Sequence, residues 1–439
     1  MLYGAPVSEP QVISLGCRLN AFEGERVRTL AQEAGFGDAV VVNSCAVTNE
    51  AVRQTRQTIR RARRSHPRAR IIVTGCAAQI DPGAFARMPE VDAVLGNVEK
   101  LDAREWRALS AGGETARVDD IMNVRETAGH LIDGYGDRAR AFLEVQNGCD
   151  HRCTFCIIPY GRGNSRSTPV GDVVAAARRL VEAGRREIVL TGVDLTSYGH
   201  DLDGAPSLGT LVGAVLEGTP DLFRLRLSSI DCAEIDEALF ERIVGEERFA
   251  PHLHLSLQAG DNMILKRMKR RHTREQAIEL CARVRARRPG IAFGADIIAG
   301  FPTETEEMFA RSLGLIDEAG LAYTHVFPFS PRDGTPAARM PQLDRAVIRE
   351  RARALREKGE AALRKFLDGL VGRIEDAVVE AGGRARLGNF AQVRLTEATR
   401  RPGLPTPERS PGFARAGEVA RLSILAREDD ILVGAPTSF

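Results

Sequence analysis

The stretch Cys149-Asp150-His151-Arg152-Cys153-Thr154-Phe155-Cys156 decides how this chain is interpreted. It follows an apolar run, residues 141–145, that predicts a β-strand. Thiols this close favour a metal site over disulfides, because the chain shows no secretory leader and cysteines in a reducing compartment more often bind metals. Zinc would need a fourth ligand, for which His151 is the nearby candidate, whereas an iron–sulfur cluster on three thiolates keeps one iron open to an external ligand. Spacing alone leaves both alternatives open.

The residue types around these cysteines are more specific than their spacing. The pattern C-x3-C-x2-C, with an aromatic residue before the last cysteine, resembles the signature of the radical S-adenosylmethionine enzymes. The continuation Ile157-Ile158-Pro159-Tyr160-Gly161-Arg162-Gly163-Asn164-Ser165-Arg166-Ser167 resembles a narrower group, the methylthiotransferases. The resemblance implies a [4Fe-4S] cluster on Cys149, Cys153 and Cys156, with S-adenosylmethionine chelating the open iron. It also implies that these groups carry the chemistry, so no side chain is expected to be catalytic.

Length and composition are those of an ordinary soluble protein. The 439 residues suffice for two to four domains. The formal net charge of +2 is nearly neutral, so contacts with nucleic acid must come from local basic patches. No run approaches the roughly 18 apolar residues that a membrane span needs. We therefore expect a cytoplasmic protein with no membrane partner, whose eight cysteines form no structural disulfides.

Residues 8–110 repeat one unit: an apolar strand, a small-residue turn, a cysteine and a polar helix. In an open parallel α/β sheet such cysteines fall at the carboxyl ends of the strands, where ligand crevices form. We therefore expect these thiols to converge, although three cysteines packed as small apolar residues are the alternative. Patterns such as Leu15-Gly16-Cys17-Arg18-Leu19-Asn20 resemble the N-terminal domain of the methylthiotransferases. The resemblance implies a second [4Fe-4S] cluster, with the ligands Cys17, Cys45 and Cys76.

A glycine-rich linker, residues 111–137, precedes a second alternating region at residues 138–370. Its predicted strands are residues 141–145, 187–191, 223–227, 252–257, 291–298 and 323–327. Six strand–helix units predict a partial (β/α)6 barrel with its site at the carboxyl ends of the strands. Turn chemistry alone can explain the glycines there. By resemblance, the residues that contact S-adenosylmethionine are Phe155, Gly192, Asp194, Ser228, Gln258 and Gly300.

Residues 371–439 carry short predicted strands, at residues 373–379, 391–395, 418–424 and 430–433. Small all-β barrels often bind nucleic acids, and by position this tail resembles the RNA-binding TRAM domain of the methylthiotransferases. Two basic runs, residues 53–70 and 266–271, predict contacts with RNA phosphates, with an ordinary solvated surface as the alternative. The fold class is thus α/β, with an N-terminal open sheet, a central partial barrel and a small C-terminal β domain.

The resemblance also implies a reaction. One S-adenosylmethionine is cleaved to a 5′-deoxyadenosyl radical that takes hydrogen from the substrate carbon, and a second supplies a methyl group. Sulfur is delivered at the open iron of the second cluster. An electron donor of the flavodoxin or ferredoxin type and a sulfur source are the implied partners, beside the substrate.

The substrate branch depends on the segment His254-Leu255-Ser256-Leu257-Gln258-Ala259-Gly260. It has serine where the branches that modify isopentenyladenosine in tRNA, or an aspartate of a ribosomal protein, usually carry proline. This favours the branch that modifies carbon 2 of N6-threonylcarbamoyladenosine at position 37 of tRNA. A non-catalytic, zinc-stabilised RNA-binding protein is the alternative from another class.

Overall fold

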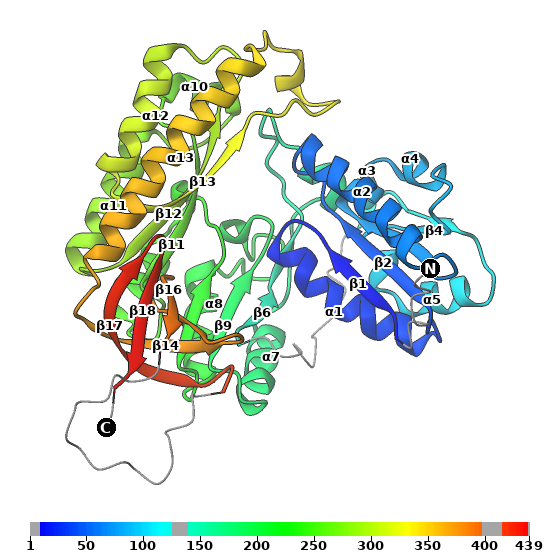
Figure 1. Ribbon diagram of the computed structural model, residues 1–439, viewed down its shortest axis with the longest axis horizontal. Helices are drawn as coiled ribbons and strands as arrows, with labels where there is room; N and C mark the ends of the chain where they lie inside the picture. Colours follow the sequence, from blue (N-terminus) through cyan, green and yellow to red (C-terminus); the bar gives the residue numbers. More distant parts are fainter. Residues whose placement is uncertain (1–8, 125–138, 397–414, 438–439) are drawn as a thin grey trace.

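The computed structural model describes residues 9–124, 139–396 and 415–437. Three units follow one another along the chain: an α/β domain, a half-open barrel and a small closed β barrel (Figure 1). The glycine-rich part of the predicted linker and most of the Pro- and Arg-rich segment at 400–415 lie outside the described residues. Within the described ranges, no helix is long and apolar enough to span a membrane.

The N-terminal domain is the open parallel sheet that the sequence predicts. Its strands pair in chain order, and all are parallel: β1 (Gln11–Ser14), β2 (Ala39–Ser44), β3 (Arg70–Gly75), β4 (Ala93–Leu95) and β5 (Ala116–Arg117). Apolar residues of α1 (Arg18–Glu33) and α5 (Ala103–Ser110) pack in one core, and those of α2 (Asn49–Ser65) and α4 (Pro82–Ala86) in another. The pattern did not predict β4, and β5 adds to this sheet two residues from the range 111–137 that the sequence assigned to the linker.

The central region is the six-stranded partial barrel predicted from sequence. Two parallel three-stranded sheets have the orders β6-β9-β10 and β11-β12-β13, and isolated parallel bridges join the β10 and β11 segments. The strands are β6 (Ala141–Glu144), β9 (Glu187–Thr191), β10 (Arg224–Leu227), β11 (His252–Gln258), β12 (Ala292–Ala299) and β13 (Leu321–Pro328). The outer helices are α7 (Val170–Glu182), α8 (Leu208–Gly218), α9 (Glu237–Gly245), α11 (Arg274–Arg287), α12 (Glu306–Glu318) and α13 (Arg345–Asp368).

Alternate residues of these strands face opposite sides, as the two-residue period of a strand requires. Leu253 and Leu255 of β11, with Ala295 and Ile297 of β12, belong to the large apolar core that also contains residues of the outer helices. Their neighbours in sequence, among them His254 and Asp296, therefore face the barrel interior.

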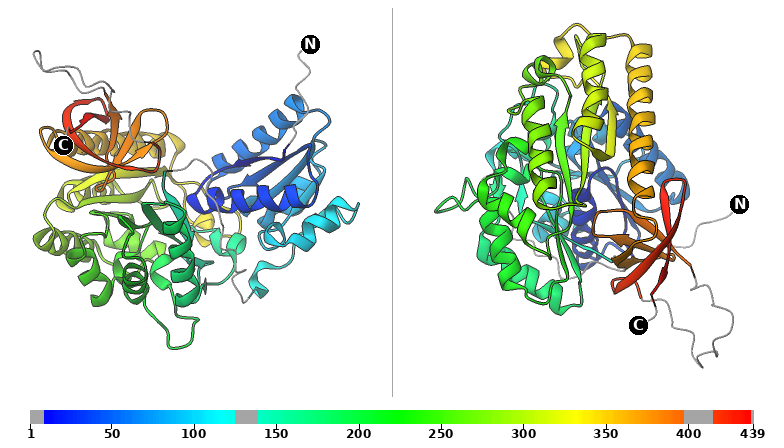
Figure 2. Two further views of the ribbon diagram at one scale, coloured as in Figure 1. Left: turned by 90° about the horizontal axis from the view of Figure 1, so that it is seen from below. Right: turned by 90° about the vertical axis from the view of Figure 1, so that its left-hand side faces the viewer.

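The C-terminal unit is a closed barrel in the order β14-β15-β16-β18-β17. Its strands are β14 (Ile374–Glu380), β15 (Arg384–Leu387), β16 (Gln392–Leu395), β17 (Val419–Glu428) and β18 (Ile431–Pro436). The sequence pattern did not predict β15, which is short and rich in arginine. Arg224 donates to the Asp376 carbonyl over 3.0 Å, and Tyr323 donates to the Asn389 carbonyl over 3.1 Å. The small barrel therefore packs against the amino-terminal ends of the large barrel's strands (Figure 2).

Candidate functional site

The cysteine loop leaves the barrel after β6 and the short strand β7 (Gln146–Asn147). Gly148, at φ +74°, precedes Cys149, and a Cβ there would lie 1.8 Å from the Asn164 carbonyl oxygen, so only glycine is tolerated. Thr154 holds the far side of the loop. Its N–H donates to the Met268 carbonyl over 3.1 Å, and its hydroxyl donates to the Arg267 carbonyl over 2.8 Å.

The three cysteines of this loop form no disulfide, and all three are partly buried. The backbone N–H of Cys156 donates to the Cys153 carbonyl over 3.0 Å, which forms a tight turn. Burial raises the pKa of Cys156 to about 11, so cluster binding must displace a proton from this thiol. Arg270 compensates for negative charge here, because its Nη1 lies 3.7 Å from the Cys153 sulfur.

His151 does not join the thiols as the zinc alternative requires. Its Nε2 lies 2.9 Å from the Asp194 carboxylate and 3.7 Å from that of Glu234. The hydrogen bonds that its imidazole donates to these carboxylates raise the pKa of His151 to about 10. The histidine is therefore a cation paired with acids.

The other residues singled out from sequence lie at the same end of the barrel as the cysteine loop. Gly192 and Asp194 follow β9, Ser228 follows β10, Gln258 ends β11 and Gly300 follows β12. The buried Ser228 hydroxyl has no hydrogen-bond partner among the described residues, so it is available to a ligand. Phe155 packs against the apolar cluster that contains Met268 and Phe301. Their contacts with S-adenosylmethionine stay a prediction.

One positioning residue at this end was not identified from sequence. Gln146 accepts a hydrogen bond from the Asp194 N–H over 2.8 Å and donates to the Gly148 carbonyl over 2.8 Å. A Cβ at Gly192 would come within 2.8 Å of its side-chain oxygen. Gln146 thus ties the cysteine loop to the end of β9. Its position, directly after an apolar strand, was the only available signal.

The N-terminal thiols also converge. Gly16, at φ +88°, lies so close to Cys45 that a Cβ on it would be 2.6 Å from the Cys45 sulfur. Gly75, at φ +93°, lies against the backbone of Ser44 in the same way and directs the chain into α3 (Cys76–Ile80). Because these two glycines have no Cβ, the ends of β1, β2 and β3 can approach one another closely. Cys17 is exposed there, whereas Cys45 and Cys76 are buried.

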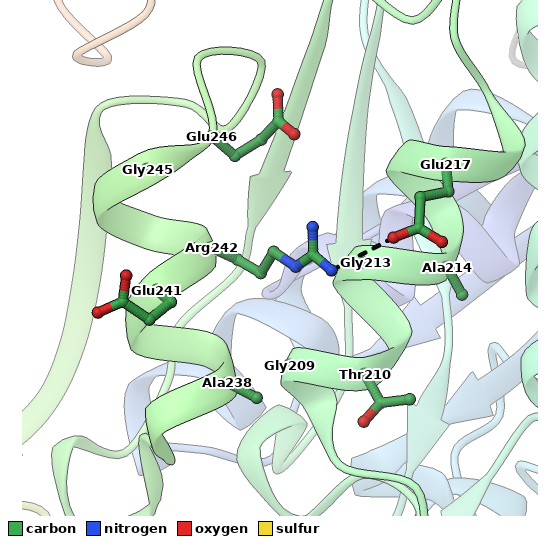
Figure 3. Close-up of a pocket in the computed structure, with 10 residues that line it drawn as sticks. All are labelled: Gly209, Thr210, Gly213, Ala214, Glu217, Ala238, Glu241, Arg242, Gly245 and Glu246. Atoms are coloured by element: carbon green, nitrogen blue, oxygen red, sulfur yellow. Dashed lines mark hydrogen bonds and ion pairs between the residues drawn. The ribbon is translucent and has the colours of Figure 1, made fainter.

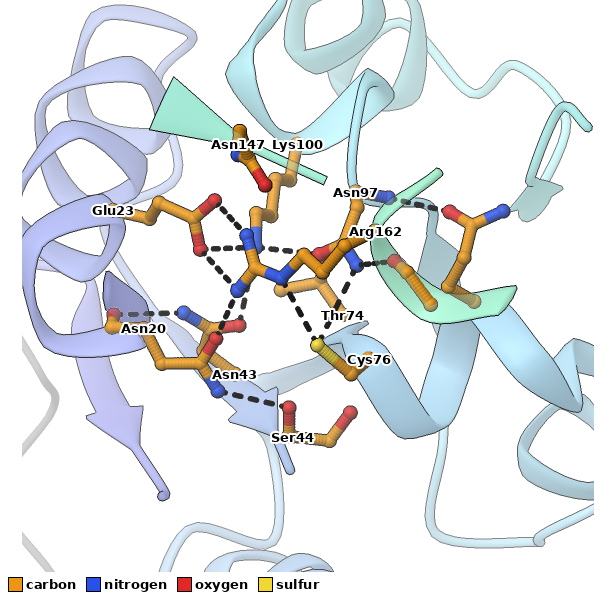
Figure 4. Close-up of polar contacts among 12 residues, drawn as sticks. Asn20, Glu23, Asn43, Ser44, Thr74, Cys76, Asn97, Lys100, Asn147 and Arg162 are labelled. Atoms are coloured by element: carbon orange, nitrogen blue, oxygen red, sulfur yellow. Dashed lines mark hydrogen bonds and ion pairs between the residues drawn. The ribbon is translucent and has the colours of Figure 1, made fainter. Parts of the chain in front are cut away.

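Arg162 of the barrel domain reaches into this second group of thiols (Figure 4). Its Nε donates to the Cys76 sulfur over 3.1 Å, and its Nη2 donates to the Glu23 carboxylate over 2.9 Å. Lys100 lies on the other side of Glu23, at 2.7 Å, and donates to the Asn97 side-chain oxygen over 2.6 Å. Arg162 ends α6 (Ile158–Arg162), the helix that follows the cysteine loop, and sequence reasoning gave it no contact with the N-terminal domain.

The segment that follows the cysteine loop packs on the N-terminal thiols. Gly161 packs on Cys76, since a Cβ on the glycine would lie 3.1 Å from the Cys76 Cβ. Gly161 follows Cys156 by only five residues. Even a fully extended chain of that length spans no more than about 18 Å.

Both thiol groups suit an iron–sulfur cluster. Each offers three reduced thiols, and each has a cationic guanidinium beside one sulfur, Arg270 at Cys153 and Arg162 at Cys76. Positive charge at hydrogen-bond distance stabilises the thiolates that bind iron. The residues present therefore fit two clusters.

Some side chains of the two basic runs are bound within the protein and are not available to RNA. In the run at 266–271, Arg270 donates to Asp231 over 2.8 Å and Arg271 pairs with Glu234 at 2.6 Å, so both help to build the cysteine site. Lys266 and Lys269 remain exposed. In the run at 53–70, Arg63 is tied to the Ala69 carbonyl at 2.8 Å. Other arginines of this run are exposed, namely Arg53, Arg56, Arg60, Arg61, Arg64 and Arg68.

Neither of two surface cavities contains a cluster ligand. One, of about 620 Å³, lies between α8 and α9 on the outside of the barrel and is lined mostly by small residues and one Arg242–Glu217 pair (Figure 3). The other, of about 550 Å³, lies where Gln79 of the N-terminal domain approaches Ile157 and Tyr160 behind the cysteine loop. The first contains no residue that the sequence singled out. The second adjoins the interface between the two thiol groups.

Comparison with known proteins gives matches over both large domains. The profile of the Radical SAM superfamily matches residues 143–316, and that of the Uncharacterized protein family UPF0004 matches residues 10–96. The threonylcarbamoyladenosine tRNA methylthiotransferase MtaB of Rickettsia prowazekii is 50% identical over 88% of this chain and 91% of its own length. The protein of the same name from Aquifex aeolicus is 35% identical over 87% and 95%. The tRNA-2-methylthio-N(6)-dimethylallyladenosine synthase of Erythrobacter litoralis is 35% identical over 85% and 87%.

A solved structure shares the fold. The radical S-adenosylmethionine methyltransferase TsrM from Kitasatospora setae, with cobalamin and a [4Fe-4S] cluster bound, has a TM-score of 0.55 at 16% identity. The match covers 74% of this chain and 77% of that one. At this identity the likeness concerns the fold alone.

Proposed function

The chain belongs to the threonylcarbamoyladenosine tRNA methylthiotransferases of the radical S-adenosylmethionine superfamily, and on that premise we propose the reaction that it performs. It transfers a methylthio group to carbon 2 of N6-threonylcarbamoyladenosine at position 37 of tRNA. Membership of a transferase family argues against the alternative of a non-catalytic RNA-binding protein stabilised by zinc. The 50% identity to the Rickettsia protein, against 35% to the Erythrobacter synthase, favours the threonylcarbamoyl branch.

A [4Fe-4S] cluster and S-adenosylmethionine follow from the superfamily. Cys149, Cys153 and Cys156 would hold this cluster, and we assign a second one to Cys17, Cys45 and Cys76. When bound, these groups supply the one-electron chemistry that removes hydrogen from the substrate carbon and the sulfur that replaces it.

The side chains at the mouth of the barrel would bind and orient S-adenosylmethionine. Asp194 is held by the Gln146 side chain and by the Ser197 hydroxyl, which donates to it over 2.8 Å, so its carboxylate is fixed at the mouth of the barrel. The unpartnered Ser228 hydroxyl can donate to a ligand there. Gly192 and Gly300 leave no room for a Cβ, because it would clash with Gln146 and Ile348 respectively, so the backbone at both strand ends packs closely against its neighbours. With Phe155 and Gln258, these residues form the proposed S-adenosylmethionine site.

The observation that carries the proposal is that the helix after the cysteine loop contacts the N-terminal thiols: Gly161 packs on Cys76, and Arg162 donates to its sulfur. A substrate carbon held between the two thiol groups can lose hydrogen on one side and receive sulfur from the other without leaving the site. The interface between the domains thus supports a division of labour: the barrel triad activates the carbon and the N-terminal triad delivers sulfur.

Recognition of tRNA would use the exposed arginines of α2 and the C-terminal barrel, because exposed guanidinium groups pair with phosphates. A flavodoxin- or ferredoxin-type electron donor, a separate sulfur source and a cytoplasmic location belong to the proposal as well.

The decisive experiment is mass spectrometry of nucleosides from tRNA of cells with and without this gene. Loss of the gene should remove 2-methylthio-N6-threonylcarbamoyladenosine and leave its precursor to accumulate. Loss of the methylthio derivative of isopentenyladenosine, or of a methylthiolated ribosomal protein, would assign the chain to another branch.

A further inference from the structure

The interior of the large barrel is polar where such barrels are usually apolar. Branched apolar side chains normally fill the interior of a closed parallel barrel. Here the inward positions carry Glu187 on β9, Arg226 on β10, His254 on β11, Asp296 on β12 and His325 on β13. Burying polar groups costs free energy unless they are paired, so an interior of this kind indicates a function other than packing.

Three of these residues form one cluster. His254 Nε2 lies 3.0 Å from Asp296 Oδ1, and His325 Nδ1 lies 3.2 Å from the same oxygen. The two imidazole rings are 4.5 Å apart. Burial would raise the pKa of Asp296, but hydrogen bonds from both imidazoles lower it to about 2, so it is an anion that accepts from both rings.

The two histidines differ in exposure, and this separates their roles. The His254 side chain is 7% exposed, whereas that of His325 is 56% exposed. His325 uses Nδ1 on Asp296, and within the described parts of the chain no hydrogen-bond partner is found for its Nε2. His254 and Asp296 therefore act as the support that orients His325.

The floor below this cluster is lined by guanidinium groups. Phe390 of the C-terminal barrel stacks on His252 with ring centroids 4.8 Å apart, and it closes the amino-terminal end of the interior. Glu187 and Glu380 pair with the surrounding guanidinium groups. The arginines around this floor are Arg140, Arg224, Arg226 and Arg386. Among the described residues, the buried Nη1 of Arg226 has no hydrogen-bond partner, so this floor keeps a guanidinium donor for an anion.

The cluster lies just below the proposed reaction site. Arg270 contacts the Cys153 sulfur and also donates to the Ser256 carbonyl over 2.8 Å. Ser256 is two residues from His254 on the same strand, a rise of roughly 7 Å. A group attached to a base at the mouth can therefore extend down to the histidines.

We propose that His325, supported by His254 and Asp296, is the subsite for the carboxylate-bearing substituent on the substrate base. The proposal rests on the proposed function and explains its specificity. A threonylcarbamoyl group adds a carboxylate, a hydroxyl and a urea to N6 of adenosine. The carboxylate accepts from Nε2 of His325 in its imidazolium form, because the Nδ1–H already donates to Asp296. A dimethylallyl group would leave these polar groups unpaired. Sites built on hydrogen bonds reject analogues that cannot make them.

The test is a binding measurement on the full-length protein without reductant, so that no turnover occurs. Three fluorescent anticodon stem-loops are compared: one with threonylcarbamoyladenosine, one with its methyl ester and one with unmodified adenosine. The wild type should prefer the first over both others. His325→Ala and Asp296→Asn should reduce that preference about tenfold or more, as expected for lost bonds to a charged group, with binding of the unmodified stem-loop unchanged. His200→Ala, at an exposed histidine, is the control.

The outcomes separate this proposal from the function on which it rests. Wild-type protein that never methylthiolates the threonylcarbamoyl stem-loop under reducing conditions would refute the function. Turnover by the wild type, with full preference kept in folded His325→Ala and Asp296→Asn proteins, would refute the subsite alone. Zinc or iron beyond that of the thiol groups, lost in Asp296→Asn, would show that the cluster is a metal site and would overturn the proposal.

Discussion

Arg162 and Cys76 belong to different domains, yet the Nε of the arginine donates to the sulfur over 3.1 Å. The guanidinium is fully enclosed in the N-terminal domain, where Glu23 is its carboxylate partner and Lys100 is a second cation. Arg162 and Lys100 share Glu23 as their ion-pair partner, and the buried Glu144 carboxyl also interacts with both cations. The Nε–H of Arg162 points at the Cys76 sulfur, where it would stabilise the thiolate of an iron-bound cysteine. The domain contact and the charge needed by the second cluster are thus provided by the same side chain.

Replacing Arg162 should damage the N-terminal site selectively. Arg162→Gln leaves Glu23 without one of its buried partners, and breaking a buried ion pair costs about 3–5 kcal/mol. We expect lower thermal stability and less iron at the N-terminal triad, while cleavage of S-adenosylmethionine persists. Iron content and electron paramagnetic resonance measure the first effect, and 5′-deoxyadenosine formation the second. Arg107→Gln, on the exposed side of α5, is the matched control; equal iron in both variants would contradict the assigned role.

The barrel triad is tested by the triple replacement Cys149→Ala, Cys153→Ala and Cys156→Ala. About half of the bound iron should be lost, since each triad is proposed to hold one cluster of the same size. Reductive cleavage of S-adenosylmethionine should fall to background. Cys281→Ala, at a buried cysteine of α11, controls for the loss of thiols in general. Persistent cleavage would remove the triad from the radical chemistry.

The N-terminal triad should separate radical formation from sulfur delivery. Cys17→Ala, Cys45→Ala and Cys76→Ala together leave the barrel loop intact, so 5′-deoxyadenosine should still form. Methylthio product should be absent, because the sulfur-delivering site is gone. Chromatography of 5′-deoxyadenosine and of the methylthiolated nucleoside from one reaction measures the two activities separately. Methylthiolated tRNA from this variant would mean that sulfur is delivered elsewhere.

Glu144 makes stability depend on pH. Burial, with a smaller effect from Glu23, raises the pKa of Glu144 from 4.5 to about 7. A carboxyl that binds its proton more tightly when folded favours folding at low pH, so the free energy of unfolding should decrease as the pH rises from about 4.5 to about 7. Glu144→Gln should remove this decrease and stabilise the protein by about 1–3 kcal/mol at pH 8. Denaturant unfolding at pH 6 and pH 8 measures it; parallel pH dependence in both proteins would contradict it.

The sequence predicted what depends on local pattern. Strand periodicity placed Cys17, Cys45 and Cys76 at strand ends, and the parallel sheet brings them together as expected. The contact of Arg162 with Glu23 was not predictable, because 139 positions separate the two residues and neither local pattern encodes the pairing. The contact of Phe390 with His252 was not predictable either, because Phe390 belongs to the C-terminal barrel and His252 to the large barrel. The sequence predicted an RNA phosphate contact for Arg270, with a solvated surface as the alternative, because a basic run does not reveal that Asp231 lies opposite it.

The difference between exposed and buried side chains in the basic run at 266–271 decides which residues should be replaced to test RNA binding. Within residues 266–271 the exposed Lys266 and Lys269 can meet phosphates, whereas Arg270 contacts Cys153 and is 8% exposed. Lys266→Gln with Lys269→Gln should weaken tRNA binding and flatten its dependence on salt by up to about one unit per lost contact. Iron content and uncoupled cleavage of S-adenosylmethionine should not change, because neither lysine contacts the cysteine loop in the part of the chain that the structure describes.

Arg270→Gln should do the opposite: it should lower iron at the barrel triad and cleavage while the salt dependence of tRNA binding stays that of the wild type. Filter binding between about 50 and 200 mM salt covers the range in which phosphate contacts are visible. If Arg270→Gln flattened the salt dependence and left iron intact, Arg270 would be a phosphate contact and the description of the cysteine site would have to change.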